Sequence, residues 1–191
     1  MSNASNVKES IIKATTELIE ENKGDVKAVT SRAIAERSGI ALGLINYHFK
    51  SKDKLIELCV QRIVNRILLC FYSGSEGGGN VIKSVINQAK QVMDFFFDNK
   101  AMAKIFILSD FKDYQPKNNS VSTQNGLKIT IGDKVDNRKK RLLCFILTSA
   151  IETAFLAGDC SRDILGCDLN DKEERDFFVE DTVYMLFQGV M

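Results

Sequence analysis

Residues 30–52 predict two short helices joined by a tight glycine turn, with a third helix beginning directly after them. Two helices that cross steeply need a small residue at their contact, a turn residue that tolerates positive φ, and a buried anchor. Ala35, Gly39 and Ile45 have the chemistry and the spacing for these three roles. Three further apolar residues complete the inner face: Ile34, Ile40 and Phe49. The segment therefore indicates a helix-turn-helix.

Polar residues of this segment suit contacts with a nucleic acid. Thr30 is placed as the N-cap of the first helix, where its hydroxyl and the free backbone amides can meet a phosphate oxygen. Arg32 lies on the outer face of that helix, and Asn46 in the second helix carries an amide that can pair with an adenine edge. The same spacing also occurs by chance in helical hairpins that bind no DNA, so spacing alone leaves both interpretations open.

The residues around the motif favour DNA binding. The motif follows an amphipathic helix near the N-terminus and ends in residues 47–55, YHFKSKDKL. With these residues the chain resembles the TetR family of bacterial regulators over about residues 7–66, and beyond them in size, helical character and closing segment. The resemblance implies an all-α fold with a three-helix helix-turn-helix DNA-binding domain at residues 1–54. A larger C-terminal helical domain for ligand binding and dimerisation would follow at residues 55–191, with residues 51–72 as the connecting helix.

The resemblance also implies roles for residues in and after the second helix, which is expected at about residues 41–48. Gly43 would allow a close approach to the DNA backbone. Tyr47 and His48 lie where phosphates or bases are contacted, and Lys52 lies where the next helix grips a phosphate. The complete set of predicted DNA-binding residues is Thr30, Arg32, Leu42, Gly43, Leu44, Asn46, Tyr47, His48 and Lys52.

The start of the second helix departs from the family pattern. The family commonly has Ser or Thr followed by Lys or Arg, where this chain has Ala41 and Leu42. A side-chain cap and one basic contact are therefore lost. Leu42 and Leu44 could meet thymine methyl groups, which favours A·T-rich DNA. Alternatively, Leu44 packs inward and Leu42 touches sugars without specificity.

Composition agrees with a helical regulator. The chain has 191 residues, one Pro, no Trp and 45% hydrophobic residues in broken runs. No apolar run approaches the ~18 residues of a membrane span, and no secretion signal is evident, so we expect a cytoplasmic protein without membrane contact. Residues 1–66 carry 11 Lys and Arg against 8 Asp and Glu, which gives weak support for a DNA partner.

Cysteine and histidine usage argues against catalysis and metal binding. The five cysteines form no C-x2-C pair, and His48 is the single histidine, so we expect no metal, no cofactor and no enzyme activity. Cys160 and Cys167 lie in a predicted loop close enough for a redox bridge, which makes a thiol-responsive regulator one alternative. A second alternative is a TetR-like helical dimer that has no ligand switch or operator function.

Helical periodicity organises most of the chain. A first helix is predicted over about residues 6–22, opened by Asn6 with Glu9 as its capping-box partner. A glycine-rich loop is expected at residues 73–80 and a polar loop at residues 115–126. The other expected segments are a helix from about 80, a short helix or irregular segment at 127–132, and long helices at about 135–158 and 171–190.

The two last helices and the buried aromatic residues supply the remaining predictions. In the TetR family such closing helices usually form a four-helix dimer interface, for which we expect Leu143, Leu147, Ala150, Ile151, Ala154, Val183 and Phe187. The family's large domain also holds a small-molecule pocket, for which the candidate lining residues are Phe71, Met93, Phe96, Phe97, Met102, Phe106, Phe145 and Phe155. Such a lining predicts a largely apolar effector. Together these features predict a homodimeric repressor that a small effector releases from a palindromic double-stranded DNA operator.

Overall fold

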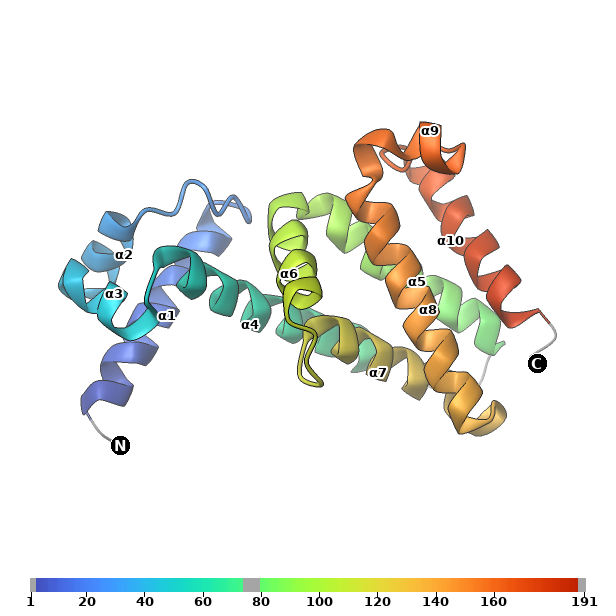
Figure 1. Ribbon diagram of the computed structural model, residues 1–191, viewed down its shortest axis with the longest axis horizontal. Coiled ribbons are helices and arrows are strands. Elements are labelled where there is room, and N and C mark those ends of the chain that lie inside the picture. The colour runs from blue at the N-terminus through green and yellow to red at the C-terminus, as the bar shows by residue number, and fades with distance from the viewer. Residues whose placement is uncertain (1–2, 74–79, 189–191) are drawn as a thin grey trace. The chain divides into compact units, whose positions relative to one another are not determined.

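The computed structural model describes residues 3–73 and 80–188, and over these residues it is helical and contains no strand (Figure 1). Six α-helices come first: α1 Asn3–Glu21, α2 Ser31–Ser38, α3 Leu42–Phe49, α4 Lys52–Ser73, α5 Val81–Asp98 and α6 Lys100–Lys112. The later elements are α7 Asn119–Ile131, η1 Gly132–Lys134, α8 Asn137–Leu156, η2 Gly158–Cys160, α9 Ser161–Leu165 and α10 Lys172–Phe187. The predicted all-α fold class is thus confirmed. Most of the predicted glycine-rich loop, residues 74–79, lies outside the described residues.

The contacts within the chain form two compact units. The first unit runs to Val64 and also includes Asn99–Ser109, which is most of α6. The second unit comprises Asn65–Asp98 and the chain from Asp110 onward. Both α4 and α6 therefore contribute residues to each unit. A single domain boundary in the sequence cannot describe this division, because each unit consists of two separate segments of the chain.

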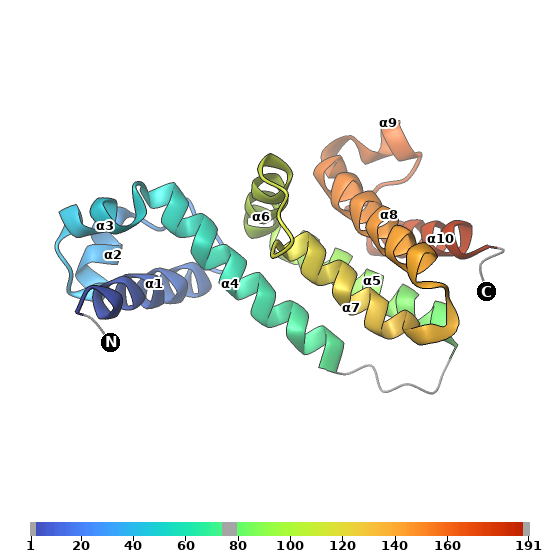
Figure 2. The ribbon, with the colours of Figure 1, turned by 60° about the horizontal axis from the view of Figure 1, so that its bottom comes forward.

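In the first unit α2 packs against α1, and α3 packs against α2 (Figure 2). Its core is apolar: Ile11 and Ile19 of α1, Ile34 of α2, Ile45 of α3 and Leu55 of α4 are fully buried. These residues follow the three-to-four spacing that places them on one face of each helix. The predicted helix-turn-helix is therefore present, with Ile45 as its buried anchor.

The prediction for the start of α1 was wrong. The helix is already formed at Asn3, so Asn6 lies inside it and accepts, through its backbone carbonyl, a hydrogen bond from Ser10 Oγ at 3.0 Å. Glu9 does not close a capping box, because its carboxylate is paired with Arg62 of α4. Glu9 thus pairs with Arg62 on a distant helix instead of with the backbone at Asn6.

The second unit packs α5, α7, α8 and α10 against one another (Figure 1). The helix predicted from about residue 80 is present, and it buries an apolar stripe that includes Val85, Ala89, Val92 and Met93. Asn80 starts this helix by accepting a hydrogen bond from the backbone N–H of Ile82 at 2.9 Å. Hydrophobic burial along these helices supplies the core of the unit.

The polar loop predicted at residues 115–126 is largely a helix. Residues from Asn119 onward belong to α7, which continues through the segment 127–131 that was expected as a short helix or irregular. The N-terminal part of α7 buries polar side chains: Asn119, Ser120, Thr123 and Gln124. Composition suggested solvent exposure here, but tertiary partners bury these groups instead.

The closing helices agree with their predicted positions within two or three residues, although η2 and α9 between them were not expected. No single helix among the described residues has the length and apolarity needed to cross a membrane. The bent pair Asn137–Leu156 and Gly158–Leu165 meets that test only when taken together, across a 73° bend.

Candidate nucleic-acid interface

The turn between α2 and α3 has the geometry that its sequence predicts. Thr30 is extended, at φ −97° and ψ 151°, and its Oγ1 accepts a hydrogen bond from the N–H of Ala33 at 3.1 Å. Gly39 ends α2 in the left-handed region at φ 67°, where a side chain would be strained. The N-cap and the glycine turn are both confirmed. Together they fix the direction in which α3 leaves α2.

α3 presents one face to solvent and anchors the other. Ile45 and Phe49 are buried, whereas Tyr47 is 79% exposed, Leu42 51% and Leu44 40%. Asn46 and Gly43 are also exposed. Of the two alternatives for Leu44, the structure supports the outward orientation. A short helix with exposed aromatic, aliphatic and amide groups offers the chemistry of base-edge and methyl contacts.

The first turn of α3 has no side-chain cap. Ala41 makes no side-chain hydrogen bond to the first turn, as the loss of Ser or Thr predicts. A Cβ atom added to Gly43 would meet nothing within 4 Å, so the fold itself does not require a glycine there. A glycine inside a helix costs about 1 kcal/mol relative to Ala. Close approach of another molecule to the α3 backbone is one reason to keep it.

Basic residues flank α3. Lys52 is half-buried, and its Nζ donates a hydrogen bond to the carbonyl of Val29 at 3.1 Å, which leaves further N–H groups for an anion. Ser51 caps α4 by accepting a hydrogen bond from the N–H of Lys54 at 3.2 Å. Thr30 and Arg32 are exposed, and His48 is half-buried with its ring edge-on to Tyr47 at 5.1 Å between centroids.

Two bidentate ion pairs hold the neighbouring helices on α1. Arg37 of α2 donates to both carboxylate oxygens of Glu21, at 2.8 and 2.9 Å, and Arg62 of α4 does the same to Glu9, at 2.9 and 3.1 Å. These hydrogen bonds lower the pKa of Glu9 and of Glu21. Exposed ion pairs contribute little to stability, but the planar fork of Arg defines orientation. Arg37, although basic, is therefore engaged within the protein.

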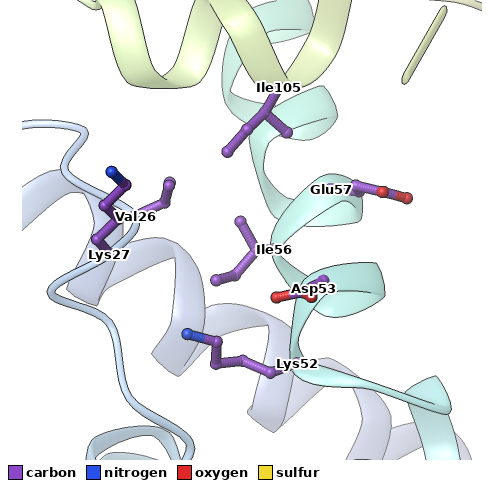
Figure 3. A pocket seen from close by; sticks show the side chains of 7 residues that line it. All are labelled: Val26, Lys27, Lys52, Asp53, Ile56, Glu57 and Ile105. Atoms are coloured by element: carbon purple, nitrogen blue, oxygen red, sulfur yellow. The ribbon is translucent and has the colours of Figure 1, made fainter. Parts of the chain in front are cut away.

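A pocket of about 250 Å³ lies in the first unit beside the helix-turn-helix (Figure 3). Val26, Ile56 and Ile105 supply apolar side chains from the segment before α2, from α4 and from α6. Charged residues complete the lining: Lys27, Lys52, Asp53 and Glu57. The pocket shows that α6 lies within reach of the helices that carry the candidate interface.

The residues that were predicted to line an effector pocket divide between the two units. Phe96, Phe97 and Phe155 pack together, with ring centroids 5.3 Å apart for Phe96 and Phe155 and 5.4 Å apart for Phe97 and Phe155. Met93 is buried in the same unit. Three others differ from this group: Met102 and Phe106 belong to the first unit, and Phe145 is 47% exposed. The side chain of Phe71 lies outside the described residues.

The residues predicted for a dimer interface are mostly core residues of the single chain. Buried members are Leu143, Leu147, Ile151, Ala154, Val183 and Phe187, and Ala150 is half-buried. The exposed apolar side chains of the same helices are Leu142, Phe145 and Ile146 on α8, and Phe177, Tyr184 and Met185 on α10. A pocket of about 410 Å³ on α10 includes Phe177 and Met185 in its lining. These two helices therefore carry an inner, buried apolar stripe that contains the predicted interface residues, and an outer, exposed apolar stripe.

Sequence reasoning missed a group of buried polar side chains in the second unit, which we call the α7 polar cluster: Asp110, Asn119, Ser120, Thr148 and Glu152. Ser120 donates both its N–H and its hydroxyl to Asp110 Oδ2, each at 2.9 Å. Burial raises the pKa of Asp110. Burial also raises the pKa of Glu152, to about 7, and the negative charge of Asp110 raises the Glu152 pKa further. The sequence did contain one indication of this cluster, because Glu152 is an acid within the otherwise apolar stripe of α8.

The cysteine pair offers little support for redox chemistry. Cys160 is exposed and Cys167 half-buried, and both are free thiols. Desolvation raises the pKa of Cys167, and the neighbouring Glu174 and Asp168 carboxylates raise it further. Because the thiolate is the reactive form, this environment disfavours reaction at Cys167.

Comparisons with known proteins bear on both the helix-turn-helix and the whole chain. Residues 11–59 match the sequence model of the bacterial regulatory proteins of the tetR family. The matched segment covers most of α1, all of α2 and α3, and the start of α4. A comparison with curated protein sequences gave no significant match.

Several solved structures share the fold at low sequence identity. A TetR transcriptional regulator from Rhodococcus sp. RHA1 is 14% identical, with a TM-score of 0.67 and 100% of both chains covered. A second transcriptional regulator from Rhodococcus sp. is 16% identical, with a TM-score of 0.60 over 98% of this chain and 97% of the other. A TetR transcription regulator from Haloarcula marismortui is 17% identical, with a TM-score of 0.54 over 95% and 96%. Residues 11–59 are thus similar in sequence to the tetR-family model, and the whole chain shares its fold with solved TetR-family regulators.

Proposed function

We propose that this protein is a DNA-binding transcriptional regulator whose α3 helix enters the major groove. The observation that carries the proposal is the two-sided character of α3, which buries Ile45 and Phe49 while exposing Leu42, Leu44 and Tyr47. An exposed apolar and aromatic face is costly unless it binds something. Base methyl groups and base edges in the major groove match its chemistry.

The proposed DNA contacts are of two kinds: contacts to phosphates, which position the protein on the DNA, and contacts to bases, which recognise the sequence. Thr30, Arg32 and Lys52 lie at helix ends beside α3, where hydroxyl, guanidinium and ammonium groups serve as phosphate ligands. Asn46 and the exposed leucines lie on α3 itself and would read bases, with a preference for A·T pairs. Gly43 would admit the backbone, and Tyr47 with His48 would contact phosphates or bases.

We propose that the regulator acts as a homodimer, because one short recognition helix reads few base pairs. Two copies related by a twofold axis read a palindrome, with half-sites about 10 base pairs apart or somewhat more. The exposed apolar side chains of α8 and α10, rather than the buried set, would form the interface. Phe145, Phe177 and Met185 are its candidate anchors.

The remaining part of the proposal is regulation. We propose a cytoplasmic repressor that releases its operator when a small effector binds the second unit, with the cluster of Phe96, Phe97 and Phe155 beside the apolar part of that effector. To shift the equilibrium by about 3 kcal/mol, the effector must bind the DNA-incompetent state about a hundredfold more tightly. No catalytic role is proposed. A helical dimer without operator function is the principal alternative, favoured by the loss of the side-chain cap at Ala41.

Selection of bound sequences from a random DNA library by the purified protein tests the proposal. Tyr47→Ala is the sharpest variant, since this side chain is 79% exposed and its loss leaves the core intact. Ile129→Ala is the matched control, because Ile129 is 69% exposed on α7, which belongs to the second unit. We expect the wild type and the control to enrich a palindrome with two half-sites and Tyr47→Ala to lose the enrichment.

Salt dependence separates the regulator from a dimer that has lost its operator. A protein with several phosphate contacts loses affinity steeply between 50 and 200 mM salt, by about 10³-fold or more for six contacts. We expect this steep loss on the selected palindrome, measured by fluorescence anisotropy. Weak, shallow and sequence-indifferent binding would instead support the alternative.

A further inference from the structure

The α7 polar cluster contains hydrogen-bonding atoms that the described residues leave without a partner. They are Asp110 Oδ1, Asn119 Nδ2, Thr148 Oγ1 and Glu152 Oε1. The exposed fractions of these four side chains are between 0 and 2%. Buried polar groups in folded proteins nearly always have partners, and an unpaired buried carboxylate is especially unfavourable. Several such atoms together indicate a site for a partner molecule.

The cluster gathers groups from three helices. Asp110 lies near the end of α6, and its Oδ2 is held by the hydroxyl and the N–H of Ser120 in α7. Thr148 and Glu152 lie one turn apart on α8, which packs along α7. The charges of Asp110 and Glu152 act on each other and on Tyr114, whose hydroxyl accepts a hydrogen bond from Gln124 Nε2 at 2.8 Å. The groups therefore form one site.

The chemistry of the open atoms defines what would satisfy them. Asp110 and Glu152 offer carboxylate acceptors, Thr148 a hydroxyl, and Asn119 an amide donor. A ligand must then supply N–H groups with positive charge for the acids and an oxygen acceptor for Asn119. A metal ion fits less well, because the described residues contain no group of three His, Cys, Asp or Glu side chains placed to hold one. A primary ammonium has three donors, the number that two acids and a hydroxyl can use.

We propose that the α7 polar cluster binds the ammonium group of a small organic amine that also carries an oxygen acceptor. The inference rests on the proposed function in one respect, since it takes this ligand to be the effector. It also changes the expected effector from a largely apolar molecule to an amphipathic one. The apolar residues of the same unit would contact the body of the molecule, and the cluster would recognise its charged end.

Calorimetric titration of the full-length protein with 2-amino-1-phenylethanol tests the site. The neutral comparison is 1-phenylethane-1,2-diol, which keeps the ring and the oxygen acceptor but replaces the ammonium with a hydroxyl. We expect the amine to bind at least tenfold more tightly than the diol. Equal affinities, or no binding of the amine, would overturn the proposal.

Substitutions locate the binding. Glu152→Gln keeps the shape of the side chain and removes a buried charge, so we expect a folded protein, checked by circular dichroism, with at least tenfold weaker amine binding. Asp110→Asn should weaken binding similarly, whereas Glu173→Gln on the exposed start of α10 is the charge-matched control and should leave it unchanged. Amine affinity retained in folded Glu152→Gln contradicts the assignment.

The two proposals can fail separately. Calorimetry on the free protein involves no DNA, so absent amine binding beside intact operator binding rejects the site and leaves the regulator. Conversely, amine that binds the cluster without releasing a selected operator leaves the site and rejects its role as the effector site. Anisotropy of labelled operator, measured with and without saturating amine, distinguishes these results.

Discussion

The two compact units treat buried polar groups in opposite ways. In the described part of the first unit, Thr15 is the buried polar side chain, and its hydroxyl donates to the carbonyl of Ile11 at 2.8 Å. In the second unit, Gln88, Asp110 and Glu152 are among many buried polar residues. All buried side-chain atoms found without a partner in the described chain belong to this second unit.

This difference agrees with the proposed roles of the two units, in which the first binds DNA and the second binds an effector. The first unit must hold α3 in one geometry, and a satisfied apolar core does so with a single packing arrangement. The second unit retains groups that reduce its own stability, which is characteristic of binding sites rather than of scaffolds. Its polar interior is therefore the place to look for a ligand, whereas the surface of the first unit is the place to look for DNA.

Truncation of the helix-turn-helix anchor should have the largest effect. Ile45 is fully buried, so Ile45→Ala should destabilise the first unit by about 2–5 kcal/mol through lost burial and a cavity. The exposed neighbour is a matched control, and Leu42→Ala should change stability by less than about 0.5 kcal/mol. Urea unfolding, with hydrogen exchange to assign the loss to α1–α4, measures both. Similar losses in the two variants would contradict the assigned faces of α3.

Removal of the buried acid should stabilise the second unit in a pH-dependent way. The pKa of Glu152 rises from 4.5 to about 7 on folding, because burial and the Asp110 charge disfavour the carboxylate. Below pH 4.5 the group is protonated in both states. Between pH 4.5 and 7 the unfolded chain ionises while the folded protein does not, so by pH 8 the folded protein has lost about 3 kcal/mol of stability relative to one with a neutral side chain. Glu152→Gln should therefore be more stable by about that amount at pH 8 and nearly unchanged at pH 4.

Urea unfolding of wild type and Glu152→Gln at these two pH values provides the measurement. Glu173→Gln, an exposed acid on α10, controls for the change in net charge. A stability difference that does not depend on pH would show that folding does not raise the pKa of Glu152.

A pair of threonine substitutions compares the two interiors directly. Thr148 Oγ1 has no partner in the described residues, so Thr148→Val should stabilise the protein by about 1 kcal/mol by removing an unsatisfied hydroxyl. Thr15 is equally buried but hydrogen-bonded, so Thr15→Val should be neutral or destabilising by up to about 1 kcal/mol. Thermal unfolding distinguishes the signs. A loss of stability in Thr148→Val would mean that its hydroxyl is satisfied in solution.

The smallest effect separates stability from DNA binding within α3. Gly43→Ala should stabilise the helix by about 0.5–1 kcal/mol, since the added Cβ meets nothing within 4 Å. The same methyl group should weaken binding to the selected palindrome, because it obstructs the approach of a DNA backbone. Paired thermal unfolding and anisotropy provide the test. Unchanged affinity would mean that DNA does not approach this position.

Local signals made the helix-turn-helix predictable. Thr30, Gly39 and Ile45 each act through neighbours in sequence, so the cap, the turn and the anchor could all be assigned from spacing. The residues expected to contact DNA there remain predictions. The start of α1 was placed incorrectly because Glu9 pairs with distant Arg62, a partner that local capping rules do not consider.

The structure of the second unit could not be predicted from local sequence in the same way. The polar residues from Asn119 to Gln124 have the composition of a loop. Asp110 accepts a hydrogen bond from the N–H of Ser120 in the first turn of α7, and because it lies ten residues earlier in the chain, local capping rules do not identify it. On α8, Leu142 and Leu143 belong to adjacent apolar stripes, so periodicity could not tell the outer face from the inner one. The loop prediction failed because tertiary contacts decide burial there, and the dimer-interface residues stay a prediction.

The division of α6 between the units has an evolutionary consequence. Ile105 lines a pocket in the first unit, and five residues later Asp110 begins the polar cluster of the second, on one uninterrupted helix. Inserting or deleting a single residue between them would rotate one side chain by about 100° relative to the other. Substitutions can therefore accumulate in this stretch, whereas changes in its length cannot. A relative with a gap here would have lost either the pocket or the cluster.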